Sequence, residues 1–87
     1  MRYFAVFLPM RDEEKSRVYR PDHLTYLQQK LEAGNVFAKG PFVDGTGGLV
    51  IYKAESFEQV ELMVKQDPYV AYDARGYEIH EWAMSQE

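Results

Sequence analysis

The stretch Arg20-Pro21-Asp22-His23-Leu24 marks the start of the first helix in the predicted fold. Proline suits the first helical position because its missing N–H would be unpaired there in any case, and Asp22 then falls in the first turn, where the helix dipole favours a carboxylate. Leucines continue at helical spacing at positions 24, 27 and 31, and the glycine at position 34 is typical of a helix end. The sequence therefore predicts a helix over residues 21–33 that carries His23 at the rim of its buried face.

The segment ahead of this helix, residues 10–19, is polar, with four consecutive charged residues at positions 12–15. Such a run is typical of a solvated face, so we expect a loop or a frayed helical turn. Residues 3–8, by contrast, are apolar at every position, which fits a strand that is covered on both faces.

The second half of the chain contains a hairpin, a helix and a last strand. The Asp44-Gly45 pair, in a turn over residues 43–48, indicates a hairpin between strands at 36–42 and 49–54. Ser56 and Gln59 match a capping box at the start of a helix that continues to about residue 66. The pair Asp67-Pro68 then begins a short extra turn, residues 73–76 form a loop, and residues 77–84 form the last strand.

The resulting order is strand, helix, strand, strand, helix, strand, which is the ferredoxin-like βαββαβ plan. It predicts an α+β fold in one domain, residues 1–87, with two helices on one face of a four-stranded antiparallel sheet. Several strands carry apolar residues on both of their faces, for example residues 3–8 and 49–52. Because monomers rarely expose large apolar patches and two-fold dimers are common, we expect a homodimer in which two sheets pack face to face.

The composition excludes several classes of function. The chain has 10 basic and 14 acidic residues and a net charge of −4, which argues against a nucleic-acid partner. It has no cysteine, so neither a thiol nucleophile nor a cysteine zinc cluster is expected, and two separated histidines make a weak case for a metal. No apolar run is long enough to span a membrane, and the apolar start lacks the cleavage site of a signal peptide. We expect a cytoplasmic protein.

His23 and Asp67 are the best candidates for chemistry. A carboxylate beside a histidine fixes the tautomer of the imidazole and makes it more basic, which suits general acid–base catalysis. Each residue also has an ordinary explanation: Asp67 before Pro68 is a good helix cap, and a histidine near a helix start is often merely hydrogen-bonded. The two interpretations of Asp67 are compatible because a carboxylate has two oxygens.

Other polar residues are weaker candidates. Arg20 could hold an anionic substrate with its planar fork or could be a surface arginine. Tyr69 follows Asp67-Pro68 and could position a substrate, whereas His80, in phase with Trp82, fits a packed or interface position. The glycines at positions 45, 47 and 48 shape a hairpin and not a phosphate loop, because no helix follows them.

A series of short motifs that spans nearly the whole chain resembles the YCII-related family: Arg20-x-x-His23-Leu24, Leu27, Gly34, Gly40-Pro41, Asp67-Pro68-Tyr69 and a closing strand near Trp82. The resemblance implies a dimeric α/β barrel, ferredoxin-like fold in which His23 and Asp67 form a catalytic dyad. It implies that Arg20 and Gly40-Pro41 border the pocket, and one branch of the family eliminates chloride from a chlorinated hydroxyquinol. The acidic segment after Pro9 and the short glycine-rich hairpin depart from the family pattern, so no substrate is implied.

These observations lead to two hypotheses. In the first, the protein is a cofactor-free acid–base enzyme, lyase or hydrolase-like, in which His23 moves a proton of a small molecule and Asp67 supports it. In the second, the protein is a dimeric module that binds a small ligand without converting it. Geometry distinguishes them: a His23 ring that reaches Asp67 and lines a cavity favours the enzyme, whereas an Asp67 used only for capping, with His23 in open solvent, favours the binding module. A third possibility, an interaction protein without a pocket, would leave both residues at the surface.

Overall fold

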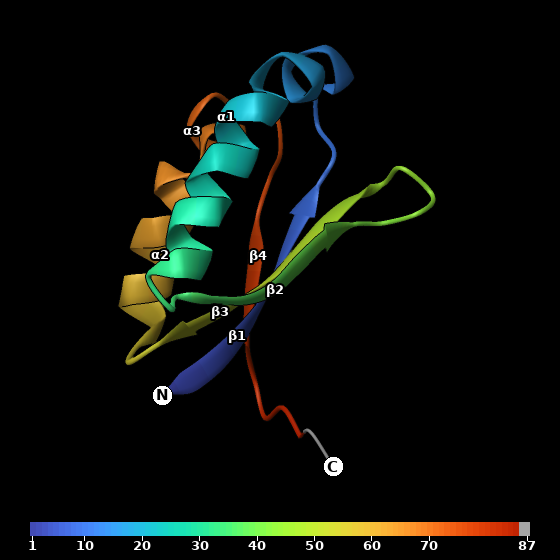
Figure 1. Ribbon diagram of the computed structural model, residues 1–87. Coiled ribbons are helices and arrows are strands. Elements are labelled where there is room, and N and C mark those ends of the chain that lie inside the picture. Colours follow the sequence, from blue (N-terminus) through green and yellow to red (C-terminus); the bar gives the residue numbers. More distant parts are fainter. Residues whose placement is uncertain (86–87) are drawn as a thin grey trace.

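The computed structural model describes residues 1–85 and has the predicted fold. Its elements are β1 (Arg2–Pro9), α1 (Glu13–Glu32), β2 (Val36–Pro41), β3 (Gly47–Ala54), α2 (Phe57–Gln66), α3 (Pro68–Ala71) and β4 (Glu78–Trp82). The sheet has the order β2-β3-β1-β4, and every neighbouring pair is antiparallel. The helices cover one face of this sheet (Figure 1), as expected of a ferredoxin-like α+β fold.

The core lies between the sheet and the helices. Phe4, Val6 and Leu8 of β1 are at most 2% exposed, and they alternate with residues of the opposite face because side chains along a strand point to the two faces in turn. The core is completed by buried residues of the other elements: Leu27, Val36, Val50, Tyr52, Ala54, Val60 and Val64. Burial of this apolar surface is the main favourable term in folding.

Helix α1 begins eight residues earlier than the sequence predicts. The prediction of a loop or a frayed helical turn over residues 10–19 is wrong from residue 13 onward, because Asp12 is itself a helix cap. Its side chain accepts the backbone N–H of Lys15, and acidic residues fill the first turn. Pro21 therefore lies inside the helix and not at its start. A proline there removes one backbone hydrogen bond and bends a helix, and α1 indeed changes direction in Figure 1.

The predicted junction after α2 is confirmed. Ser56 caps α2 by accepting the N–H of Gln59, whose side chain accepts the N–H of Glu55. Asp67 ends α2 and caps the short α3, with proline at the first helical position. This junction fixes the backbone of Asp67 and Tyr69 on the helix side of the sheet.

Two further elements differ slightly from prediction. The hairpin has a five-residue connection, residues 42–46, in which Asp44 accepts both the backbone N–H and the hydroxyl of Thr46. The last strand spans only Glu78–Trp82 of the predicted residues 77–84, because its pairing with β1 begins at Glu78 and ends at Trp82.

The face of the sheet away from the helices also carries many apolar side chains, as predicted, beside the polar Lys53, Glu78 and His80. It carries a cluster that we call the outer face, made of Tyr3, Ala5, Phe7, Phe37, Phe42, Leu49, Ile51 and Trp82. Tyr3 meets Phe37 edge-on at 5.6 Å between ring centroids, and Phe7 stacks on Phe42 at 6.2 Å. Exposed fractions of 37% for Phe7 and 44% for Trp82 show that the helices leave this face uncovered.

Candidate functional site

His23 and Asp67 form a buried pair. Nδ1 of His23 lies 2.8 Å from Oδ1 and 2.9 Å from Oδ2 of Asp67. Asp67 is 1% exposed and His23 is 8% exposed. The middle of α1 and the junction between α2 and α3 therefore bring together two residues 44 positions apart in the chain, and water is largely excluded from the contact.

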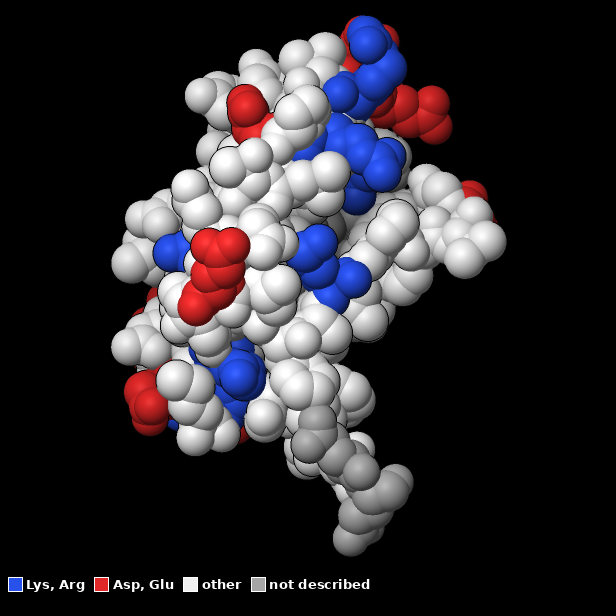
Figure 2. Space-filling view, viewed as in Figure 1, with Lys and Arg blue, Asp and Glu red and all other residues white. Residues whose placement is uncertain are grey.

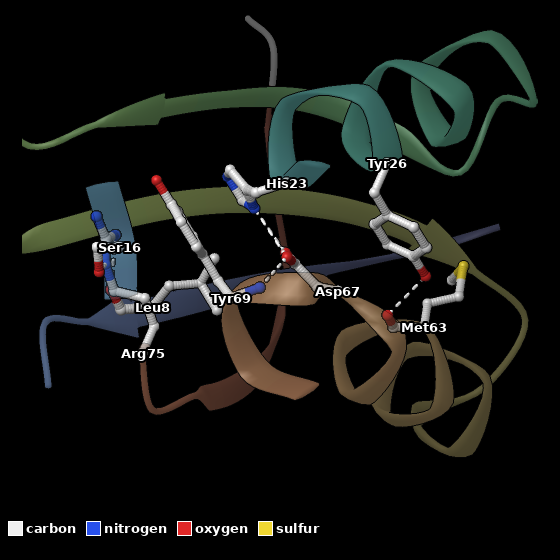
Figure 3. Close-up of polar contacts among 8 residues, drawn as sticks. All are labelled: Leu8, Ser16, His23, Tyr26, Met63, Asp67, Tyr69 and Arg75. Carbon is white, nitrogen blue, oxygen red and sulfur yellow. Dashed lines mark hydrogen bonds and ion pairs between the residues drawn. The ribbon is translucent and has the colours of Figure 1, made fainter. Parts of the chain in front are cut away.

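Asp67 performs its capping role at the same time. Its Oδ1 also accepts the backbone N–H of Tyr69 at 2.9 Å (Figure 3). An ionised carboxylate can only accept, so Nδ1 of His23 is the donor of this contact, and in a neutral imidazole this leaves the lone pair on Nε2. The arrangement presents Nε2 as the nitrogen available to a ligand, which is the geometry of an oriented general base.

Tyr69 lies between His23 and Arg75, as Figure 3 shows. Its ring stacks on the imidazole with centroids 3.8 Å apart, and Cζ of Arg75 lies 4.4 Å from the centre of the phenol ring. Arg75 also donates from Nε to Oγ of Ser16 at 3.0 Å. The stack leaves the imidazole little freedom to rotate, because one face is packed and Nδ1 is bonded.

His23, Tyr69 and Arg75 border a pocket of about 90 Å³. Five of the six residues singled out in the sequence line it: Arg20, His23, Gly40, Pro41 and Tyr69. The sixth, Asp67, lies behind His23 and reaches the pocket only through the imidazole. The remaining lining is mostly apolar: Leu8, Leu24, Leu27, Leu49 and Val50.

Besides the apolar residues, the pocket lining includes Lys39, Gly48 and Arg75, which the sequence did not predict as part of the site. Lys39 could have been found, because it precedes the Gly40-Pro41 pair that was already placed at the pocket. Arg75 gave no local signal, since it lies in the loop before β4. One local bond, from the N–H of Arg75 to the carbonyl of Tyr69 at 2.9 Å, helps to fix this loop. The long-range contacts are made by the carbonyl of Ala74, which accepts the N–H groups of Arg11 and Asp12.

Two tyrosines lie near Asp67 in the core. Burial, assisted by the negative charge of Asp67, raises the pKa of Tyr26 to about 12, and the same causes raise the pKa of Tyr52 further. The hydroxyl of Tyr26 donates to the carbonyl of Met63 at 2.7 Å (Figure 3). Both phenols are therefore neutral at physiological pH.

The second histidine belongs to another part of the molecule. His80 pairs with Glu78 at 2.8 Å and meets the ring of Phe7 edge-on, on the outer face of the sheet. Among residues 1–85, no three potential metal-ligating side chains gather at one place. The expectation that the protein uses no cofactor stays a prediction.

The YCII-related domain model matches residues 1–83. The chain belongs to the YCII-related family. Over 82 residues this YCII-related protein is 29% identical to the uncharacterised protein YjpA of Bacillus subtilis, with 94% of this chain and 96% of YjpA covered. A solved structure that it resembles is 5-chloro-2-hydroxyhydroquinone dehydrochlorinase (TftG) from Burkholderia phenoliruptrix AC1100, in complex with 2,5-dihydroxybenzoquinone. The TM-score is 0.81 and the identity 23%, with 95% of each chain covered.

The likeness to TftG establishes the fold of this YCII-related protein and leaves its reaction open. Within the part of the chain that the structure describes, no helix is long and apolar enough to cross a membrane. The cytoplasmic location expected from the sequence remains a prediction.

Proposed function

We propose that this YCII-related protein is a cofactor-free acid–base enzyme, of the lyase or hydrolase-like kind, that acts on a small molecule. The observation that supports this proposal most directly is the buried contact between His23 Nδ1 and Asp67, in a histidine that also lines a pocket. A purely structural histidine would need no cavity, and a purely capping aspartate would need no imidazole. General acid–base help of this kind contributes about 10²–10⁴ to a rate.

In the proposed reaction, Nε2 of His23 takes a proton from the bound molecule. The imidazolium that forms is stabilised by the Asp67 carboxylate, which stays ionised throughout. For an elimination, the electron pair of the broken bond to hydrogen forms a new double bond, and the leaving group departs with its own bonding pair. His23 then releases the proton to water, so that one proton and one anion are lost from the substrate.

The structural neighbour supports a lyase-type reaction on a ring compound. TftG is a dehydrochlorinase of the same fold and was captured with a dihydroxybenzoquinone. Arg20, Gly40, Pro41 and Tyr69 are proposed to hold the substrate, because each lines the pocket beside His23. The pocket is small and mostly apolar, which suits a single ring better than a larger molecule.

We further propose that the enzyme is a homodimer with the outer faces of two sheets packed together, as in a dimeric α/β barrel. The outer face supports this arrangement because it carries the aromatic pairs Tyr3–Phe37 and Phe7–Phe42, and because Phe7, Phe37 and Trp82 remain exposed there.

Two assays test the proposed chemistry. Chloride release from 5-chloro-2-hydroxyhydroquinone tests elimination, and exchange of the ring hydrogens of 2,5-dihydroxybenzoquinone in deuterium oxide, followed by NMR, tests proton transfer alone. We expect the wild type to accelerate at least one of these reactions and His23→Gln to reduce the rate to background. His80→Gln is the matched control, because it makes the same change at the other histidine, on the opposite face of the sheet.

Equal rates for the wild type and His23→Gln would contradict the proposal. Binding of 2,5-dihydroxybenzoquinone with no acceleration in either assay would instead support the alternative, a dimeric module that binds a small ligand without converting it.

A further inference from the structure

The basic residues of this chain are distributed unevenly. Three of the 10 lysines and arginines line the pocket, namely Arg20 of α1, Lys39 of β2 and Arg75 of the loop before β4. None of the acidic residues among positions 1–85 lines it. Figure 2 shows basic groups gathered around the hollow between α1 and the β2–β3 hairpin, with acidic groups elsewhere on the same face. In a chain of net charge −4, this local excess of positive charge is unexpected.

The three charges lack carboxylate partners. Among residues 1–85, the salt bridges of basic side chains involve Arg2, Arg11 and Arg17, and none involves Arg20, Lys39 or Arg75. Arg75 is held by neutral groups: the hydroxyl of Ser16 at 3.0 Å and the carbonyl of Leu8 at 3.4 Å. Cations that share a pocket without counter-charges repel one another, and an anion that enters the pocket relieves this repulsion.

We propose that the pocket is a binding site for a small organic anion with an apolar body, such as a carboxylate or an ionised phenol on a single ring. The cations would bind the charged group, and the leucines and the valine of the lining would contact the ring. Arginine forks suit a planar oxyanion because they donate two parallel hydrogen bonds. The inference rests on the proposed function for its place in catalysis, because an anion held here lies beside His23, and the same cations would stabilise negative charge that develops after proton removal.

Gly48 leaves space for a ligand in this pocket, and Arg75 is held in place beside that space. A Cβ on Gly48 would lie 3.8 Å from Nη1 of Arg75 and 3.1 Å from the carbonyl oxygen of Gly40, so any larger side chain would fill the space between the hairpin and the guanidinium. Arg75 is fixed from behind by Ser16 and lies over Tyr69. The guanidinium therefore does not need to be ordered when the anion binds, which lowers the entropic cost of binding.

Benzoate and benzamide form a matched pair of probes, because they share the ring and differ in charge. Titration followed through the backbone amide signals of Gly40 and Gly48 should show binding of benzoate, weaker binding of acetate and no binding of benzamide at the same concentration. Arg20→Gln and Lys39→Gln should each weaken benzoate binding about five- to tenfold, and added salt should weaken it in the wild type. Lys65→Gln, on the exposed side of α2, should leave it unchanged.

Thermal unfolding separates a binding role from a structural one. Because the cations repel one another, neither Arg20→Gln nor Lys39→Gln should lower the melting temperature. Arg75→Lys keeps the charge and loses the fork, so it should weaken binding less than Arg75→Gln does.

Equal binding of benzamide and benzoate, or unchanged benzoate binding in both Arg20→Gln and Lys39→Gln, would overturn the anion site. These outcomes are independent of the proposed reaction. Turnover that depends on His23 without benzoate binding would reject only the anion site, and benzoate binding without turnover would reject only the enzyme.

Discussion

The phenol ring of Tyr69 lies against the imidazole of His23, with centroids 3.8 Å apart and planes 15° from parallel. The backbone N–H of the same tyrosine bonds to Asp67, the partner of that imidazole. Tyr69 thus holds both members of the pair in place, one through its ring and the other through its main chain. The position of the proposed general base, His23, therefore depends on a residue that need not touch the reacting atoms.

Replacing the ring of Tyr69 should therefore impair turnover more than removing its hydroxyl. We expect Tyr69→Leu to lower kcat by about tenfold to a hundredfold, because a small displacement of a catalytic group can cost about 10² in rate. Tyr69→Phe keeps the stack and should retain kcat, with any change confined to KM. The imidazole NMR signals of His23 provide a check that needs no substrate: they should move in Tyr69→Leu and stay in place in Tyr69→Phe. A kcat in Tyr69→Leu equal to that of the wild type would show that the stack is dispensable.

Asp67 allows capping and catalysis to be separated. In Asp67→Asn the side-chain oxygen can still accept the N–H of Tyr69, since asparagine is as good a cap as aspartate, but the negative charge is lost. We expect a fall in turnover of about 10²–10⁴ and a free energy of unfolding within about 1 kcal/mol of the wild type. Asp67→Ala also leaves the N–H of Tyr69 and the Nδ1–H of His23 unpaired, which should cost about 2–4 kcal/mol. Denaturant titration and the turnover assays measure these effects, and equal stability of the two variants would contradict this assignment.

The secondary-structure order could be predicted because each signal is local. Each of these signals acts over a few residues: the apolar run of a strand, the glycine at a helix end, the Ser56 cap and the Asp67-Pro68 pair. The order of the elements then indicates the βαββαβ topology. The start of α1 was missed because two local signals compete. Pro21 favours a helix that starts at residue 21, whereas Asp12 and the acidic residues after it favour a start at residue 13. In the folded protein the helix starts at residue 13.

The candidate site was predicted only where it lies on these local elements. Asp67 and the Gly40-Pro41 pair were found from their places at helix and strand ends, and His23 was found from the helix start expected at Pro21, although it lies in the middle of α1. Arg75 was not found, because its position results from contacts between the loop before β4 and the start of α1, including those of Ala74 and Ser16. Such contacts join residues more than 50 positions apart and leave no pattern in a single sequence.

Strand β1 lies so close to the hairpin at Gly47 that this position should not tolerate a side chain. Gly47 has a φ of +147°, and a Cβ there would overlap the carbonyl oxygen of Leu8. We expect Gly47→Ala to lower the free energy of unfolding by about 2 kcal/mol or more, because backbone strain and steric overlap act together. Gly45→Ala is a suitable control: it has a φ of +80° but open space around it, so it should cost only about 1 kcal/mol. If Gly47→Ala lowers the free energy of unfolding no more than Gly45→Ala does, β1 and β3 can move apart at Gly47 at little cost, and the prediction is wrong.

The outer face makes the homodimer testable. Phe37 is 39% exposed and packs edge-on against Tyr3, so Phe37→Lys places a charge in the proposed interface without entering the core. We expect the wild type to elute with twice the 10.2 kDa mass of the chain and Phe37→Lys to elute as a monomer, as measured by light scattering. Leu62→Lys makes the same kind of change on α2, where Leu62 is 60% exposed, and should remain dimeric. A monomeric wild type at the highest concentration tested would reject the dimer.

Tyr26 links stability to alkaline pH. Burial near Asp67 raises its pKa to about 12 in the folded state, above the ordinary value of 10.0 for a tyrosine. Between these two values the unfolded chain has lost the phenol proton while the folded chain keeps it, so the free energy of unfolding must fall as pH rises from 10 towards 12. The contribution is fully present below pH 10. Tyr26→Phe removes the hydrogen bond to Met63 and should lower the free energy of unfolding by about 1 kcal/mol at neutral pH. Its free energy of unfolding should then fall less steeply between pH 10 and 12 than that of the wild type, and the fall that remains comes from Tyr52. Denaturant titrations at several pH values would measure both slopes, and identical slopes would show that Tyr26 ionises equally easily in the folded and unfolded chain.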